Sequence, residues 1–170
     1  MVRPVNEDPY LSYRFQVLDP TGTNLKIDGG FKTATLPNVT VNAVTYREGT
    51  DQWTRKYPGI NEVSELSLET GIFRRNSAFF DWIVRIIQGG NREYRSELIV
   101  NQFHMQDSFG SKGTPSRVTR LLNCFPTDVK PTGDLSGEDD AVQIETATFA
   151  CEQIQVELKA TTSTPIPLNP

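Results

Sequence analysis

Few residues in this chain are suited to chemistry. Its 170 residues include one histidine, His104, and two cysteines, Cys124 and Cys151. A nucleophilic site needs a base beside its serine or cysteine, but His104 lies in a strand-like run without a nucleophile motif around it. A zinc site needs four ligands, and no carboxylates at a suitable spacing complete such a set. We therefore expect no catalytic residue, no metal site and no cofactor.

The two cysteines are 27 positions apart and form no Cys-x-x-Cys motif. In a chain made in a reducing compartment, this pattern favours two free buried thiols. A disulfide between Cys124 and Cys151 is the alternative.

Charge and hydropathy narrow the range of partners. The chain carries 17 Lys and Arg against 21 Asp and Glu, a formal net charge of -4, which argues against tight binding of nucleic acid. It contains no apolar run long enough to insert into a membrane, and residues 1–9 do not have the pattern of a signal peptide. We expect one domain, residues 1–170.

Alternating apolar and polar residues, the pattern of a half-buried β-strand, recur along most of the chain. They predict strands at residues 10–18, 63–73, 95–104, 117–129 and 142–158, and the Val- and Thr-rich residues 39–46 have the composition of a further strand. At about 3.3 Å per residue the last run would be roughly 55 Å long, which exceeds a normal strand in a domain of this size. We therefore predict a bend or bulge within it, near Glu152.

Residues 76–88 break this pattern and predict a helix of about three turns. Asn76 or Ser77 can cap its start, and Gly89-Gly90 ends it. Asp81 and Arg85 are expected on the outer face. The apolar stripe consists of Phe79, Phe80, Trp82, Ile83, Ile86 and Ile87. The predicted fold is thus mainly β, an antiparallel β sandwich or barrel with one packed α-helix.

Two connections are too long for a self-contained sandwich, residues 19–37 and residues 47–61. The second holds Trp53 and Tyr57 among Arg47, Arg55 and Lys56, a composition typical of protein interfaces. The alternative is that Trp53 is a core residue beneath a long loop. Residues 1–9 are expected to form an N-terminal arm, and the Pro/Thr-rich residues 159–170 an extended tail.

Taken in order, these elements resemble the tail-tube proteins of contractile phages and contractile injection systems. The resemblance extends over about residues 8–158. It rests on Asp8-Pro9-Tyr10, Gly30-Phe31, Tyr46-Arg47-Glu48-Gly49, Arg55-Lys56-Tyr57-Pro58-Gly59, the helix with Phe80, Trp82 and Ile83, Asn123-Cys124-Phe125-Pro126-Thr127, and Val142-Gln143-Ile144-Glu145.

The resemblance implies a structural role. Subunits of this family share strands in a hexameric ring, and rings stack into a hollow inner tube that works as a conduit. The implied partners are other copies of the chain, contractile sheath subunits, baseplate, spike and tube-terminating proteins, with possible cargo in the lumen. Residues 47–61 would be the arm that contacts a neighbouring subunit. The predicted interface residues are Arg47, Glu48, Trp53, Arg55, Lys56, Tyr57 and Pro58.

Other functions remain as alternatives. A monomeric ligand-binding β barrel would suit the strand pattern, and a baseplate or tube-cap relative would share the fold. An enzyme would have to manage with a single histidine. Within the tube family, the particle is a phage tail or an injection system, and the subunit is the main tube protein or a minor paralogue.

Overall fold

A computed structural model describes residues 10–20, 30–72, 78–89, 94–105, 107, 114–133, 135 and 142–158. Its elements in chain order are β1 (Phe15–Leu18), β2 (Phe31–Thr35), β3 (Val39–Tyr46), β4 (Arg55–Val63), β5 (Leu66–Gly71), α1 (Ala78–Ile87), β6 (Ser96–Gln102), β7 (Arg117–Lys130), β8 (Ile144–Ala150) and β9 (Gln153–Leu158). All pairings are antiparallel. The prediction of a mainly β fold with one packed helix is confirmed.

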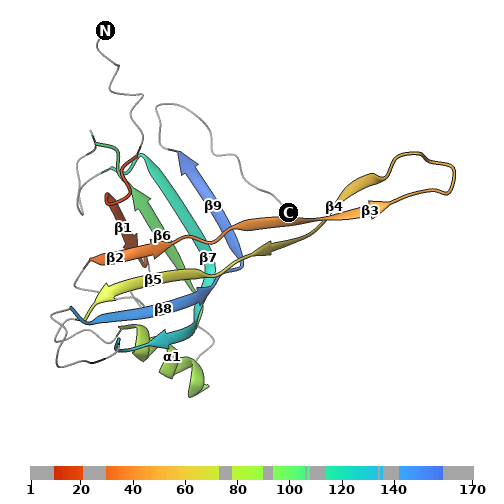
Figure 1. The fold of residues 1–170 in the computed structure, drawn as a ribbon. Coiled ribbons are helices and arrows are strands. Elements are labelled where there is room, and N and C mark those ends of the chain that lie inside the picture. The colour runs from red at the N-terminus through yellow and green to blue at the C-terminus, as the bar shows by residue number, and fades with distance from the viewer. Residues whose placement is uncertain are drawn as a thin grey trace, which may run out of the picture.

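Strand β7 is the longest strand, and it belongs to two layers. Its first half pairs with β6 and β9, and its second half pairs with β8 (Figure 1). Strands β8 and β9 follow one another along the same edge of β7, because Phe125 pairs with Ala150 and Leu122 with Gln153. The chain leaves β8 and enters β9 at residues 151–152, so the predicted division near Glu152 is confirmed.

A corner in β7 accompanies this division. Asn123 has a φ of 55°, in the left-handed region that asparagine tolerates better than most residues. Its side-chain Nδ2 donates a 2.7 Å hydrogen bond to Glu152 Oε2 on the opposite chain segment. We name this bend, Asn123 with Glu152, the β7 corner.

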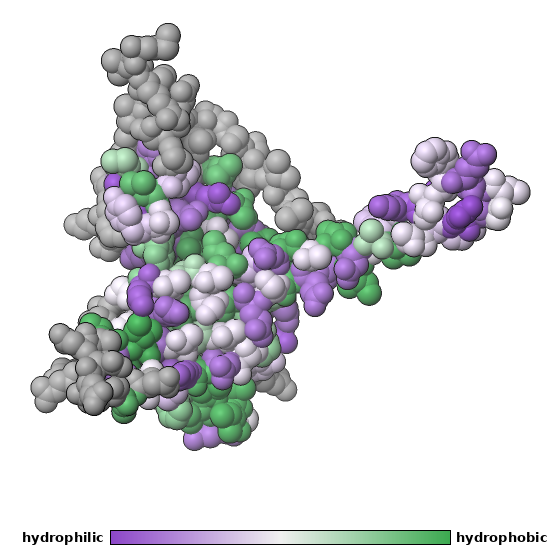
Figure 2. Space-filling view, viewed as in Figure 1, coloured by the Kyte–Doolittle hydropathy of each residue, from purple (hydrophilic) through white to green (hydrophobic). Residues whose placement is uncertain are grey.

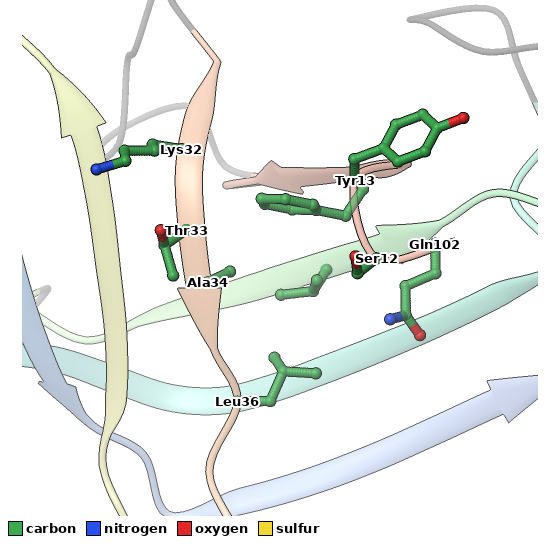
Figure 3. Close-up of a pocket in the computed structure, with 9 residues that line it drawn as sticks. Ser12, Tyr13, Lys32, Thr33, Ala34, Leu36 and Gln102 are labelled. Carbon is green, nitrogen blue, oxygen red and sulfur yellow. The ribbon is translucent and has the colours of Figure 1, made fainter. Parts of the chain in front are cut away.

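The β7 corner divides the sheet into two layers. One contains β1, β6, the first half of β7 and β9, and the other contains β2, β5, β8 and the second half of β7. The continuous strand order is β1-β6-β7-β8-β5-β2, so β1 and β2 are its two edges. These edge strands lie on either side of a pocket (Figure 3).

Helix α1 packs against the core through an aromatic cluster. Phe79 and Trp82 are buried, and their rings lie 5.6 Å and 5.4 Å from the ring of Phe149 on β8. The indole Nε1 of Trp82 donates a 2.8 Å hydrogen bond to the carbonyl oxygen of Tyr94, so the buried ring leaves no polar atom unpaired. In β5, Leu66, Leu68 and Thr70 are buried, as the alternation predicts.

Several predicted boundaries are wrong. The strand expected at residues 10–18 begins only at Phe15, because the chain before it forms a turn in which Arg14 N donates to the carbonyl oxygen of Leu11 (3.3 Å). The connection expected at residues 19–37 contains strand β2, which pairs with β5. The alternation of the terminal run predicts one buried face that includes Ile144, Thr146, Thr148 and Ala150. This prediction is wrong, because the buried side chains of β8 are the opposite set, Glu145, Ala147 and Phe149.

The predicted helix is right, but its apolar stripe is narrower than expected. Phe80 is 45% exposed and Ile87 76% exposed, whereas Phe79 and Trp82 are buried. Arg85 Nε donates to the carbonyl oxygen of Asp81 (3.2 Å), and both residues are exposed as predicted. Gly89 follows the helix with a φ of 67°, the left-handed conformation that glycine adopts at helix ends. The expected caps Asn76 and Ser77, like residues 1–9 and 159–170, lie outside the described residues.

The orientation of α1 can be tested with adjacent residues. Trp82→Ala should lower the free energy of unfolding by about 3 to 5 kcal/mol, since it empties a buried site and leaves the Tyr94 carbonyl without its donor. Asp81→Ala changes an exposed neighbour and should lower it by less than about 1 kcal/mol. Urea denaturation followed by circular dichroism measures both. Equal losses would contradict this packing.

A second prediction concerns the buried carboxyl group of Glu145, which is 4% exposed. Burial, and then the negative charge of Asp81, raise the pKa of Glu145. The unfolded chain therefore ionises this group at a lower pH than the folded chain does. Folding stability should fall as pH rises from about 4.3, the ordinary glutamate pKa, through the raised folded pKa, and the deficit should persist above it.

Glu145→Gln removes this titration. The variant should melt at a higher temperature than the parent at pH 7, and the difference should shrink toward pH 4. Thermal melts across this pH range measure it, with the exposed Glu62→Gln as a matched control. A Glu145→Gln variant that is less stable at pH 7 would show that the carboxylate is stabilised where it lies.

Candidate functional site: a projecting hairpin

Strands β3 and β4 form a separate two-stranded sheet that projects from the body of the protein (Figure 1). We call residues 39–63 the arm. Two hydrogen bonds close its base, from Ser64 N to the Asn38 carbonyl oxygen (3.0 Å) and from Asn38 N to Ser64 Oγ (2.8 Å).

The arm continues the sheet of the body. Strands β2 and β5 pair as far as Thr35 with Ser67, and β3 and β4 resume with Val39 opposite Val63 in the same register. The segment from β2 to β5 is therefore one long hairpin, with its root in the core and its outer half in the arm. Because the pairing of β2 with β5 sets the register of β3 with β4, it also determines which face of the arm each side chain occupies.

A β-bulge bends the arm at Gly59. Val41 pairs with Asn61 and Ala43 with Pro58, so β4 carries one extra residue at this point. A Cβ at position 59 would lie 2.8 Å from the Asn42 carbonyl oxygen, closer than real Cβ contacts allow. The Pro58-Gly59 pair therefore belongs to a bulged strand, which explains why glycine is needed there.

Asp51 organises the turn at the tip of the arm. Its carboxylate Oδ2 lies 3.2 Å from Arg55 NH2, and its carbonyl oxygen accepts a 3.1 Å hydrogen bond from Arg47 Nε. Its own amide donates to the carbonyl oxygen of Glu48 (3.0 Å). Trp53 lies in this turn and is 84% exposed.

The arm exposes an unusual amount of apolar surface. Every residue of β3 is exposed, and β4 is exposed except at Gly59 and Val63. Figure 2 shows hydrophobic side chains nearer the body and hydrophilic ones at the tip. The large apolar side chains involved are Val39, Val41, Val44, Tyr46, Trp53, Tyr57 and Ile60. Contiguous apolar surface of this kind marks interaction sites, and an isolated two-stranded hairpin is only marginally stable.

The structure gathers the predicted interface residues in the outer half of the arm. These are Arg47, Glu48, Trp53, Arg55, Lys56, Tyr57 and Pro58, in the tip turn and the first half of β4. One expectation is wrong: residues 47–61 are a turn and a strand rather than a loop, and Pro58-Gly59 concealed the strand in the sequence. Trp53 is exposed as expected, so the alternative of a core residue is wrong. The role of the seven residues as an interface remains a prediction.

Sequence reasoning placed the arm's beginning too late in the chain. The whole of β3 is part of it, with Val39, Val41, Val44 and Tyr46 exposed. One signal was present, because this Val- and Thr-rich run has apolar residues on both faces where a half-buried strand would show one polar face.

A pocket of about 350 Å³ lies between β1 and β2 (Figure 3). Phe15, Ala34, Leu36 and Val100 contribute its apolar lining, and Ser12, Tyr13, Lys32, Thr33 and Gln102 its polar lining. The ammonium of Lys32 and the hydroxyl of Tyr13 point away from each other rather than toward a common centre. A ligand site needs convergent polar groups, so this pocket gives little support to a ligand-binding barrel.

His104, the one histidine of the sequence, takes part in an aromatic contact. It lies just after β6, where its ring packs edge-on against Tyr10 at a centroid distance of 5.7 Å. Within the described ranges, no three His, Cys, Asp or Glu side chains come together as metal ligands would. The helix that the structure describes is too short to span a bilayer.

Comparison with known proteins identifies the family. The family model of the T4-like virus tail tube protein gp19 matches residues 11–155. No curated protein sequence matches the chain significantly.

Solved structures share the fold at low sequence identity. A chain of the PVC sheath-tube complex, an extracellular contractile injection system in the extended state, is 20% identical with a TM-score of 0.73, covering 91% of this chain and 95% of that one. A chain of the anti-feeding prophage cap is 19% identical with a TM-score of 0.72, covering 89% and 93%. Hcp1 from Salmonella typhimurium is 11% identical with a TM-score of 0.52, covering 87% of each chain. Because the family model spans most of the sequence, the chain belongs to the family of the T4-like virus tail tube protein gp19, whose members are structural tube subunits.

Proposed function

We propose that this tube subunit forms six-membered rings that stack into the hollow inner tube of a contractile phage tail or injection system. The observation that carries the proposal is the arm, an ordered extension of the core sheet that exposes apolar side chains on a member of a tube family. A subunit that must hold neighbours in place needs such a surface, and its function requires no catalytic group.

The arm is proposed to bind a neighbouring copy of the chain. Trp53 at the tip would be the anchor, since aromatic side chains carry much of the binding energy at interface centres. Arg55 is held by Asp51, so its charge is positioned before binding, and Lys56 follows on the rim. We propose that the predicted interface residues make this contact. They are Arg47, Glu48, Trp53, Arg55, Lys56, Tyr57 and Pro58.

Ring formation would use the edges of the sheet. Strands β1 and β2 end the continuous strand order, and β9 pairs only with β7 among the described strands. Unpaired edges are usually protected, and closure of a barrel by neighbouring subunits is one way to protect them. Six copies with a net charge of -4 would give a ring of about -24, which suits a conduit with little affinity for nucleic acid.

The solved structures that share this fold suggest further partners. Their descriptions name a sheath-tube complex, a sheath/tube terminator, a tube-terminating cap and a baseplate. We propose sheath, baseplate and terminating proteins as partners, cargo in the lumen, and assembly in the bacterial cytoplasm into a virion or a phage-tail-like particle. The second candidate function is that of a terminating cap, because a chain of the cap structure matches with nearly the same TM-score as a chain of the sheath-tube complex.

Self-assembly is the first test of the proposed function. The purified full chain should form sixfold rings or stacked tubes at high protein concentration, because the arm and the sheet edges then find their partners. Negative-stain microscopy and light scattering after size exclusion measure this. Stacked tubes favour the tube subunit, and rings that never stack favour the cap. A species of monomer mass with no rings would contradict both.

The second test removes the anchor of the arm. Trp53→Ala should weaken each subunit contact by about 2 kcal/mol or more and abolish assembly, because the loss repeats around the ring. The melting temperature of the monomer should stay the same, since Trp53 is 84% exposed within its own chain. Sedimentation velocity and thermal melts on the same sample separate the two effects.

A matched pair of exposed aliphatic residues controls this experiment. Ile60 on the arm is 82% exposed and Leu135 on the body is 77% exposed. Ile60→Ala should reduce assembly, whereas Leu135→Ala should leave it near the parent level. If Trp53→Ala and Ile60→Ala both assemble as the parent does, the arm is not the interface.

A further inference from the structure

Cys124 and Cys151 meet in the core at the point where the two layers join. Cys124 lies on β7 directly after Asn123 of the β7 corner, and Cys151 lies between β8 and β9. They occupy opposing positions, one step beyond the pairing of Phe125 with Ala150. Both are free thiols and both belong to the hydrophobic core cluster, with exposures of 0% and 8%.

The geometry suits a covalent bond between these two residues. Their Sγ atoms lie 2.8 Å apart, and the thiol of Cys124 donates toward the sulfur of Cys151. Opposing residues of an antiparallel pair have Cα atoms about 4.5 to 5.5 Å apart, within the range of about 4.4 to 6.8 Å that a disulfide spans. The backbone therefore needs no rearrangement to accept the bond.

We propose that Cys124 and Cys151 are an oxidation site, which a low-molecular-weight disulfide such as oxidised glutathione converts into an intrachain disulfide. The Cys151 thiolate attacks the reagent, forms a mixed disulfide and releases one small thiol. The Cys124 thiolate then attacks the Cys151 sulfur and releases the second small thiol. Two cysteine thiols lose two electrons and two protons, and one reagent disulfide is reduced to two thiols.

The same environment makes these thiols unreactive in the folded chain. The hydrogen bond with Cys151, and then burial, raise the pKa of Cys124 far above its ordinary value. A thiolate is the reactive species, so the folded chain protects the pair from casual oxidation. Reaction begins at Cys151, the more exposed of the two residues, during local opening where β8 gives way to β9.

The bond would lock the β7 corner. It joins β7 to the residue at which β8 gives way to β9, and it encloses the 26 residues between the cysteines. Closing such a loop restricts the unfolded chain and stabilises the folded one. Oxidation should therefore raise the melting temperature of the chain by on the order of 5 to 10 °C.

The experiment refolds the full chain from urea in an excess of oxidised glutathione, which gives the reagent access to both thiols. Denaturing alkylation and mass spectrometry should then show no alkylated cysteine, a mass lower by two hydrogen atoms, and a peptide that links Cys124 to Cys151. The melting temperature of this sample should exceed that of its reduced form.

Variants and alternative products keep the proposal testable. Cys151→Ala should lose the rise in melting temperature and leave Cys124 as a glutathione adduct or a free thiol, and Cys124→Ala should behave in the same way at Cys151. In the parent chain, two alkylated cysteines, a stable glutathione adduct or disulfide-linked dimers would each overturn the proposal.

Discussion

Strand β7 can serve two layers only because it bends at Asn123, and the rest of the structure depends on that bend. A straight strand of this length would hold β6, β8 and β9 in one flat sheet and leave the aromatic side chains of α1 without a core. At the β7 corner Asn123 adopts a left-handed conformation, and its side chain is hydrogen-bonded to Glu152. Strand β7 and the paired segment from β8 to β9 therefore bend at the same place. The layers can then enclose Phe79, Trp82 and Phe149. The cysteine pair next to Asn123 buries the inner side of the same turn.

The arm depends on the body mainly through register, since Val63 at its base is the one arm residue that packs against the hydrophobic core. Its other large apolar side chains are exposed, yet its strands continue the pairing of β2 with β5, which is anchored by the buried Leu66 and Leu68. A change in the core that slipped β5 by one residue would exchange the two faces of the arm. Fold stability and the presentation of the proposed contact residues are therefore linked even though they involve different side chains.

Sequence periodicity predicted the elements whose burial is one-sided. In β5 every second residue is buried, and in β6 Leu98 and Val100 alternate with half-buried residues, so both strands were evident. The helix was evident from its aromatic and aliphatic stripe. The buried face of β8 was not evident, because Glu145 on that face interrupts the alternation of apolar and polar residues. Asn123 gives no signal of a left-handed conformation by itself, since the conformation is imposed by its partner strand. The predicted interface residues were chosen from composition, and exposure on both faces of β3 is a property of the folded chain.

Pro58 and Lys56 bear on how the arm behaves before it meets a partner. A two-stranded ribbon presents backbone hydrogen-bond donors and acceptors along both edges, and such edges promote aggregation through strand pairing between copies. Pro58 removes one donor from the edge of β4, and the exposed Lys56 puts a charge two positions away. The bulge at Gly59 further disturbs the straight edge that an added strand would need. The arm is therefore a poor template for fibrils, while its side-chain faces remain available for the proposed contact with a neighbouring copy.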